Sequence, residues 1–226
     1  MQRSVIVTGA SGGLGGAVTT AMLDSGWRVV APVRDARGGA RVERADEIEL
    51  VQADLTDPAA AEVVVAAAGD GLRALVNLVG GFAAPGRVHE TPIADFEAQL
   101  RLNLRPTYLM CAAALPVLLA GGGGAIVCTS ARAALRPFAG ASGYVTAKAG
   151  VLAFVDALDV EYRAQGIRAN AVLPSVIDTP ANRTSMPDAD HARWVAPAEI
   201  ARVVAFLCSD DASAISGARV PVYGRA

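Results

Sequence analysis

Residues 4–18 read SVIVTGASGGLGGAV, in which a short apolar run meets a glycine-rich turn that leads into a helical pattern. A turn between a strand and a helix presents backbone N–H groups that can bind a diphosphate. Gly9 allows a tight turn, Gly13 lets the backbone approach a pyrophosphate, and Gly15 allows close packing at the helix start. The stretch predicts a dinucleotide-binding turn. The alternative is a glycine-rich connection that binds nothing.

Apolar runs and helical segments alternate along the rest of the chain. The runs are SVIVT, WRVVAPV, EIELVQA, RALVNLV, GAIVCT, IRANAVL and ARVPVYG, and the helices expected between them include residues 91–119, 142–165 and 197–209. This order is typical of a parallel sheet that is covered on both faces. The glycines at 121–124 fit a helix-to-strand connection better than a linker. We therefore expect an α/β fold, a single doubly wound Rossmann-type domain over residues 1–226 with about seven parallel strands.

The composition argues against several classes of function. The formal net charge is −2, and scattered arginines offer no basic surface for nucleic acid. Cys111, Cys128 and Cys208 lie in apolar contexts, which favours buried thiols over metal ligands or a disulfide. The apolar run at the N-terminus is short for a secretion signal, and no long uninterrupted apolar stretch indicates a membrane span. We expect a cytoplasmic protein that acts on a small molecule.

Tyr144 and Lys148 lie four residues apart in the expected helix 142–165, so both can face the same ligand. A free tyrosine has a pKa of about 10, and a nearby ammonium group favours the phenolate. The pair therefore indicates acid–base chemistry. An aromatic residue and a lysine on an ordinary helix are the alternative.

Together these motifs resemble the short-chain dehydrogenase/reductase family over nearly the whole chain. The pattern TGxxxGxG is matched from Thr8 to Gly15 and YxxxK by Tyr144 and Lys148, while NLVG at Asn77 alters the usual NAG. The resemblance implies an NAD(P)-dependent oxidoreductase and a homodimer or homotetramer. It implies catalytic roles for Tyr144, Lys148 and Asn103. It implies a cofactor site formed by Thr8, Gly9, Ser11, Gly13, Leu14, Gly15, Arg34, Asp54, Leu55, Asn77, Gly80, Tyr144, Lys148, Pro174, Ile177 and Thr179.

Two segments, SARAALRPFAGASGYVTAK and LPSVIDTPANRTSMPDADHARW, are similar to those of dihydropteridine reductase within that family. In the wider family a serine usually precedes the tyrosine by thirteen positions, where this chain has Ala131, and Ser130 stands one residue earlier. Successive strand residues face opposite ways, so Ser130 should turn from the site unless a bulge restores it. The pattern indicates either an activated ring system as substrate or a site where Tyr144 alone polarises the carbonyl.

The residues after the second expected strand bear on the choice of cofactor. Val33 occupies the place where an acidic residue would accept the adenine ribose hydroxyl of NAD, and Arg34 follows it. A guanidinium group suits a 2′-phosphate, so NADP(H) is favoured and NAD(H) remains possible. Gly12 gives no second basic residue, and Asp35 could also reach the ribose.

The substrate is expected beside the nicotinamide, among Gly81, Phe82, Ala131, Arg132, Arg136, Val176, Asn182, Met186 and Trp194. If Arg132 or Arg136 faces the pocket, the substrate is anionic or a polar heterocycle; otherwise both arginines are merely solvated. His89 and His191 receive no role, and no metal site is expected. A hydride would pass between nicotinamide and a carbonyl or quinonoid carbon. The alternative function is a nucleotide-binding regulator that keeps the fold without turnover.

Overall fold

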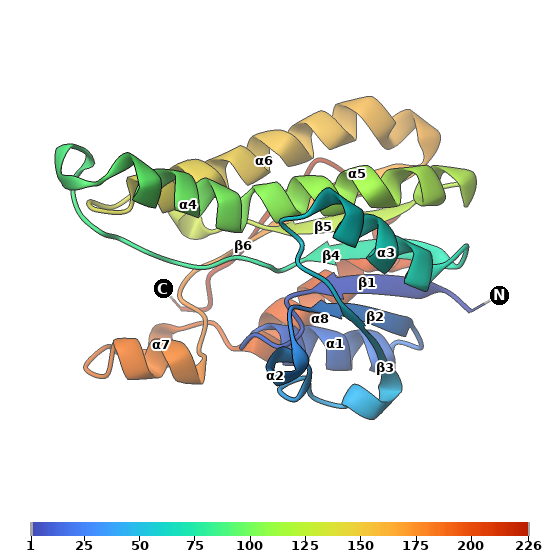
Figure 1. The fold of residues 1–226 in the computed structure, drawn as a ribbon, viewed down its shortest axis with the longest axis horizontal. Coiled ribbons are helices and arrows are strands. Elements are labelled where there is room, and N and C mark those ends of the chain that lie inside the picture. The colour runs from blue at the N-terminus through green and yellow to red at the C-terminus, as the bar shows by residue number, and fades with distance from the viewer. Residues whose placement is uncertain (1, 226) are drawn as a thin grey trace.

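A computed structural model describes residues 2–225, which form one sheet with helices on both faces (Figure 1). All seven strands are parallel, in the order β3-β2-β1-β4-β5-β6-β7. They are β1 (Ser4–Thr8), β2 (Arg28–Val33), β3 (Ile48–Gln52), β4 (Leu72–Asn77), β5 (Gly124–Thr129), β6 (Ile167–Pro174) and β7 (Arg219–Val222). The expected doubly wound α/β fold is confirmed.

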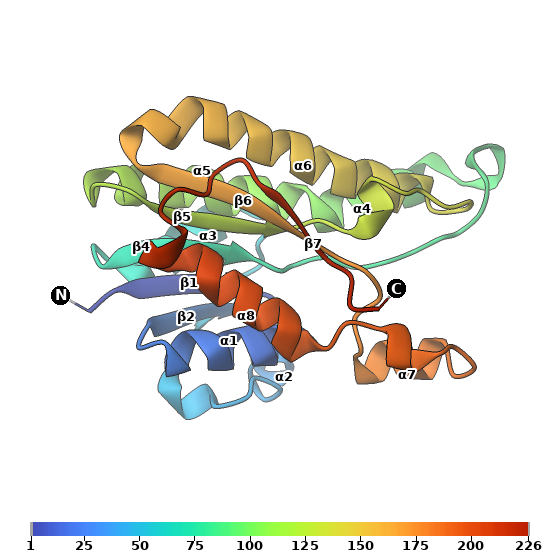
Figure 2. The same ribbon diagram turned by 180° about the vertical axis from the view of Figure 1, so that it is seen from behind.

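The helices form a layer on each face of the sheet. Figures 1 and 2 show α4, α5 and α6 over one face and α1 and α8 over the other. The α-helices are α1 (Gly15–Asp24), α2 (Ala36–Gly39), α3 (Pro58–Ala68), α4 (Ile93–Asn103), α5 (Arg105–Ala120), α6 (Ser142–Tyr162), α7 (Pro180–Ser185) and α8 (Pro197–Cys208). Short 3-10 turns lie at Ala45–Glu47, Val88–Glu90, Arg132–Ala134, Arg163–Gln165, His191–Arg193 and Asp210–Ala212.

Alternating strand residues supply two hydrophobic cores, one on each face. In β1, Val5 and Val7 pack with α1 and α8, whereas Ile6 packs with α3 and α5. A central parallel strand is buried on both sides, which is why it reads as a nearly continuous apolar run.

The expected helix 91–119 is two helices, which corrects the sequence-based boundary. Helix α4 ends at Asn103 and α5 begins at Arg105, with Leu104 between them. Pro106 lies in the first turn of α5, where its missing N–H is tolerated but where it ends the preceding hydrogen-bond ladder. The stretch Ile93–Ala120 is long and apolar enough to cross a membrane, but Met110, Leu118 and their neighbours are buried against the sheet.

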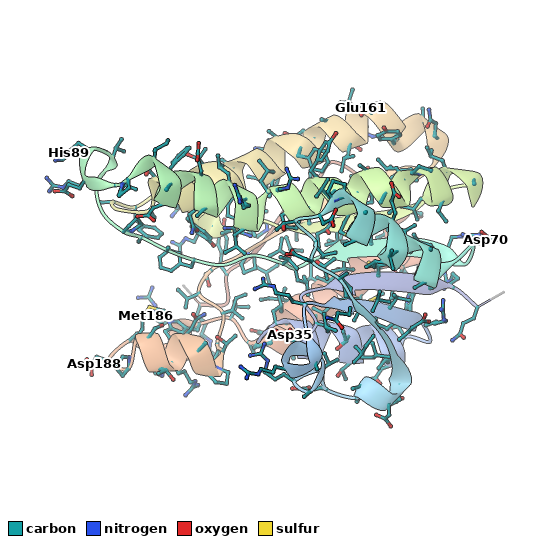
Figure 3. All side chains as sticks on the ribbon, in the orientation of Figure 1. Asp35, Asp70, His89, Glu161, Met186 and Asp188 are labelled. Carbon is teal, nitrogen blue, oxygen red and sulfur yellow. The ribbon has the colours of Figure 1, made fainter. Side chains whose placement is uncertain are left out.

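The carboxyl ends of the strands lie at one edge of the sheet. The N-terminus and Asp70 lie at one end of the molecule (Figures 1 and 3). Met186, which directly follows α7, lies at the opposite end. Parallel α/β sheets bind ligands beyond the carboxyl ends of their strands, at the point where strand order reverses. Here that point lies between β1 and β4, which follow each other in the sheet but not in the chain.

Candidate active site

The glycine-rich turn after β1 is built by close backbone contacts. Gly9 has φ +75°, a conformation that suits glycine. A Cβ placed on Gly15 would lie 2.2 Å from the carbonyl oxygen of Gly9, and one placed on Gly13 would lie 2.6 Å from Cγ2 of Thr179. Gly13 therefore permits the approach of the segment after β6 as well as the expected approach of a phosphate.

The Thr8 side chain lies at the end of β1 and faces the chain beyond β4. Its hydroxyl is buried and accepts hydrogen bonds from the backbone N–H groups of Leu78 (3.0 Å) and Val79 (3.3 Å). The side chain therefore ties the end of β1 to the chain beyond β4. The side chain thereby fixes the position of the turn, and the expected contact of Thr8 with the cofactor stays a prediction.

The side chain of Asn77 is buried at the end of β4, and its expected place beside the cofactor stays a prediction. Its amide nitrogen lies 3.4 Å from Sγ of Cys111 and 3.7 Å from Sγ of Cys128, inside the core under α5. The contact between the two thiols and burial raise the pKa of Cys111, so that thiol stays neutral. The side chain of Asn77 therefore positions β4 from within.

The adenosine end of the expected cofactor site lies after β2 and β3. Arg34 is exposed, whereas one carboxylate oxygen of Asp35 accepts the Gly38 N–H at 2.7 Å and caps α2. Asp54 accepts the N–H and hydroxyl of Thr56, and these bonds, with Arg34 nearby, lower its pKa. Arg34 is therefore an exposed positive charge that an anionic ligand could meet here.

Gly80 brings the predicted catalytic residues together. A Cβ placed on Gly80 would lie 2.6 Å from Oδ1 of Asn103 and 3.1 Å from Nζ of Lys148. Asn103 Oδ1 accepts the N–H of Gly81 at 3.0 Å, and its amide donates to the carbonyl of Gln99 at 3.1 Å. The Asn103 side chain thus holds the loop after β4. Its backbone carbonyl, at the break between α4 and α5, accepts only a long 3.4 Å bond from Thr107 Oγ1.

Tyr144 and Lys148 lie one turn apart on α6, and burial controls both. Burial raises the pKa of Tyr144 to about 12, and burial lowers the pKa of Lys148 to about 8 against a smaller opposing effect of Cys128. Lys148 Nζ is 6.0 Å from the Tyr144 ring centroid and donates to the carbonyl of Thr129 at 3.0 Å. Desolvation is the cause that raises the pKa of Tyr144 here, and the expectation that the Lys148 ammonium favours the phenolate stays a prediction.

Ser130 faces α6. Its hydroxyl donates to the backbone carbonyl of Lys148 at 2.8 Å, and its N–H donates to the carbonyl of Val172 at 2.9 Å. Pairing of β5 with β6 runs without a shift from Gly124 to Thr129, so no bulge turns Ser130 around. Ala131 follows in an extended conformation and is buried.

Aromatic side chains stand beside Tyr144 on the expected substrate side. Phe82 meets the Tyr144 ring edge-on at 5.1 Å between centroids, and Phe138 lies 6.1 Å from Phe82. Both phenylalanines are more than half exposed. The sequence analysis did not predict Phe138 as a site residue. Its place in the loop before α6 is the only sequence signal for it. Arg132 stacks its guanidinium on the Tyr223 ring at 5.2 Å, and Arg136 is exposed.

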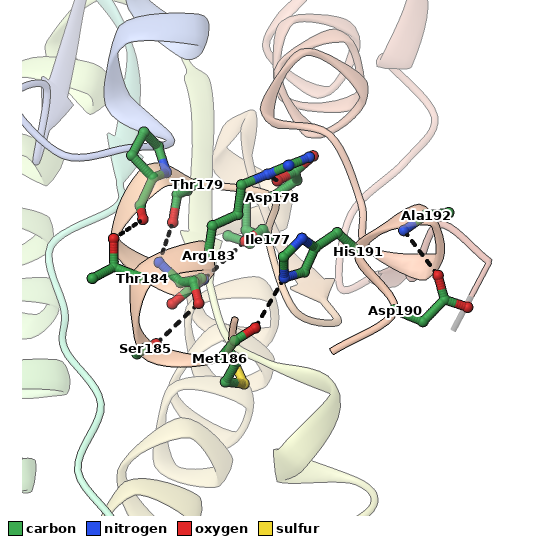
Figure 4. A network of polar contacts seen from close by, with 12 residues as sticks. Ile177, Asp178, Thr179, Arg183, Thr184, Ser185, Met186, Asp190, His191 and Ala192 are labelled. Atoms are coloured by element: carbon green, nitrogen blue, oxygen red, sulfur yellow. Dashed lines mark hydrogen bonds and ion pairs between the residues drawn. The ribbon is translucent and has the colours of Figure 1, made fainter. Parts of the chain in front are cut away.

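The segment from Ile177 to Trp194 follows β6 and is held by its own polar contacts (Figure 4). Thr179 caps α7 by accepting the Asn182 N–H at 3.2 Å, and Asn182 donates to the carbonyl of Ile177 at 2.8 Å. Arg183 pairs with Asp178, and His191 Nε2 lies 2.9 Å from the Met186 carbonyl. His191 also packs on Trp194, 4.3 Å between ring centroids. His191 therefore supports this segment, a structural part that the sequence did not indicate.

The site as a whole fits a dinucleotide. The turn has glycine at positions 9, 12, 13 and 15, the exposed Arg34 offers a positive charge for a phosphate, and Thr129 Oγ1 is a buried hydroxyl without a partner among residues 2–225. The remaining predicted cofactor residues lie near the same edge of the sheet: Ser11 and Leu14 in the turn, Leu55 after β3, and Pro174 at the end of β6. Within the described residues, no group of three or more His, Cys, Asp or Glu side chains could hold a metal ion.

Known proteins are similar to this chain in sequence and structure. A sequence model described as enoyl-(acyl carrier protein) reductase matches residues 9–224. The chain is 34% identical to 2-(R)-hydroxypropyl-CoM dehydrogenase of Xanthobacter autotrophicus, over 99% of this chain and 98% of that protein. It is 33% identical to cyclohexanol dehydrogenase of an Acinetobacter species, over 98% and 94%.

A solved structure extends the likeness to three dimensions. An oxidoreductase of the short-chain dehydrogenase/reductase family from Burkholderia thailandensis superposes with a TM-score of 0.89 at 31% identity, over 99% of this chain and 92% of that one. The similarity spans the glycine turn, the sheet and the helix with Tyr144 and Lys148. The chain therefore belongs to the short-chain dehydrogenase/reductase family and is an NAD(P)-dependent oxidoreductase.

Proposed function

We propose that the protein is an NADP(H)-dependent reductase in which Tyr144 donates a proton to the oxygen of a carbonyl or quinonoid substrate. The observation that carries this proposal is the convergence of Lys148, Asn103 and Gly80 one helical turn from Tyr144. A tyrosine whose pKa is raised to about 12 stays protonated at neutral pH and so carries the proton that the reduction needs. The cofactor supplies or accepts the hydride.

The other residues would bind and orient. Arg34 would hold the 2′-phosphate, since Asp35 caps α2. Lys148 would leave the Thr129 carbonyl and turn to the ribose hydroxyls, where its charge would also favour the Tyr144 anion after proton transfer. The backbone carbonyl of Asn103 would hold a water that returns the proton, because the helix break leaves this carbonyl only one weak partner.

The aromatic pair supports a ring-shaped, largely apolar substrate. Phe82 offers flat apolar surface against the Tyr144 ring, Phe138 lies beside Phe82, and the exposed Val176 and Met186 after β6 would add apolar surface. The name of the related cyclohexanol dehydrogenase is consistent with a ring substrate. Ala131 supplies no hydroxyl to polarise a carbonyl, which favours an activated ring, as the resemblance to dihydropteridine reductase also implies.

A nucleotide-binding regulator without turnover is the second candidate, and Ala131 and the altered NLVG are what favour it. We also place the protein in the cytoplasm as a homodimer or homotetramer on family grounds, which size-exclusion chromatography with light scattering would test. The deciding experiment follows NADPH oxidation with cyclic ketones and a quinonoid dihydropteridine. Tyr144→Phe should keep cofactor affinity and lose about 10² or more in kcat. If the wild type binds NADPH and reduces none of a broad panel, the regulator is favoured.

A further inference from the structure

Thr129 carries an unusual hydroxyl. Its Oγ1 has no solvent exposure and no hydrogen-bond partner, and it is the sole buried side-chain oxygen or nitrogen in that condition within residues 2–225. The residue as a whole is nevertheless partly exposed. A buried hydroxyl without a partner is costly, and such a group calls for an explanation such as a ligand. Thr129 also ends β5, at the ligand-binding edge of the sheet.

The direction of the side chain follows from the alternation along β5. Ile126 and Cys128 face the core under α5 and α6, and Ser130 bonds to α6, so these three point to one side. Val127 faces the core under α8, and Thr129 follows it on that opposite side. Ala131 continues extended, with φ −158° and ψ 156°, so it shares the side of Thr129. Thr129 thus lies two residues before position 131, where the family usually has its serine, and on the same side of the strand.

The surroundings of Thr129 are those expected for the nicotinamide. Its backbone carbonyl accepts the Lys148 ammonium at 3.0 Å, which places it beside the proposed catalytic lysine. Leu78 and Ile177 pack against the same core from the neighbouring strand ends, and Ile177 is among the residues expected at the carboxamide. The hydroxyl therefore lies where the floor of the nicotinamide site is expected.

We propose that the Thr129 hydroxyl hydrogen-bonds the nicotinamide half of the bound cofactor, a contact that rests on the cofactor site of the proposed function. A threonine hydroxyl and methyl group exchange places by rotation about χ1, and the hydroxyl both donates and accepts. Partial exposure of the residue gives such a rotation access to the ligand. The carboxamide presents both a donor and an acceptor, so either sense of bond satisfies the hydroxyl.

The test compares cofactor with a fragment that lacks nicotinamide. Dissociation constants for NADPH and for 2′,5′-ADP are measured calorimetrically on the wild type, on Thr129→Val, which keeps the shape, and on Thr129→Ser, which keeps the hydroxyl. We expect Thr129→Val to weaken NADPH binding about 5- to 30-fold and 2′,5′-ADP binding less than about 2-fold. Thr129→Ser should stay within about 3-fold of wild type for both. None of these readouts depends on turnover.

Several outcomes would overturn the assignment. Unchanged NADPH affinity in Thr129→Val, with a higher unfolding midpoint, would show an orphan hydroxyl of the core whose removal simply stabilises the protein. Equal loss of both ligands would point to a general disturbance of the site. Failure of Thr129→Ser to retain affinity, with a normal unfolding midpoint, would show that shape and not the hydroxyl matters. A wild type that binds neither NADPH nor NADH would instead overturn the proposed function and this contact with it.

Discussion

The hydroxyl of Ser130 donates a 2.8 Å hydrogen bond to the backbone carbonyl of Lys148. This bond joins the end of β5 to the middle of α6, the helix that carries both Tyr144 and Lys148. Both partners are buried, so the hydroxyl has no free path to a substrate. Ser130 thus supports the position of the proposed catalytic helix. The same strand register that turns its side chain away from the substrate side directs its hydroxyl to α6.

Ser130→Ala should therefore affect stability more than catalysis. We expect kcat/KM to change by less than about tenfold, while the free energy of unfolding falls by about 1–2 kcal/mol because the buried Lys148 carbonyl loses a donor. Denaturant unfolding and steady-state kinetics on one preparation measure both effects. A loss of two or more orders of magnitude in kcat/KM without loss of stability would place Ser130 in the reaction itself.

Ala131→Ser should supply the polarising hydroxyl that the chain lacks. Ala131 is buried and follows β5 in extended conformation, on the side opposite to Ser130. A donor about 2.7–3.1 Å from the developing oxyanion is worth up to about 10²–10³ in rate. We expect activity on simple ketones to rise relative to quinonoid acceptors, measured as the ratio of kcat/KM values for one substrate of each kind. An unchanged ratio would mean that position 131 does not face the substrate oxygen.

Lys148 is the chain's only lysine, so its ionisation can be followed alone. Burial lowers its pKa from 10.5 to about 8, so the folded state binds the proton less tightly than the unfolded state does. Lys148 should therefore raise the free energy of unfolding by about 3 kcal/mol as the pH increases from 8 to 10.5. Lys148→Met should remove this dependence.

Nitrogen NMR of protein labelled only at lysine measures the same pKa directly. The side-chain signal of Lys148 should titrate with a midpoint near 8 in the cofactor-free protein, because desolvation disfavours the ammonium. A midpoint at the ordinary lysine value would contradict the argument that burial controls this group. It would also support the expectation of a fully charged lysine beside Tyr144.

Arg34→Ala should weaken NADPH binding more than NADH binding, by about 1.5–3 kcal/mol, because the charged hydrogen bonds to the 2′-phosphate are lost. Dissociation constants of both cofactors decide the matter, and Arg202→Ala on α8, which lies outside the predicted cofactor residues, serves as the control. Equal losses for the two cofactors would remove the case for a 2′-phosphate contact. A larger loss for NADH would instead implicate the ribose hydroxyls.

The sequence predicted what depends on local pattern. Alternation of apolar runs located the strands, and the glycines at 9 and 15 predicted a turn whose backbone contacts admit no side chain. The sequence did not predict the features that depend on packing between distant segments. Periodicity alone could not end α4 at Asn103, and nothing local shows that the Asn77 side chain faces two thiols in the core. The pKa of Tyr144 depends on how deeply the tertiary fold buries it, which spacing along a helix cannot reveal.

Phe138 tests whether the aromatic side chains select a ring. It lies 6.1 Å from Phe82, which in turn meets Tyr144 edge-on, and it is 51% exposed, so its removal should leave the core intact. Phe138→Ala should raise KM for a cyclic ketone about 5- to 30-fold through lost apolar contact, with kcat within about threefold and little change for a short open-chain ketone.

Phe206→Ala is the matched control for that experiment, because Phe206 is an exposed phenylalanine on α8, in the helix layer opposite to α6. It should change neither KM. Phe82→Leu should go further than Phe138→Ala, since Phe82 touches both the proposed substrate site and the Tyr144 ring, and kcat should fall along with affinity as the tyrosine gains freedom. If Phe138→Ala raises KM equally for cyclic and open-chain ketones, the aromatic pair contributes only general apolar surface, and the preference for a ring must come from the segment that carries α7.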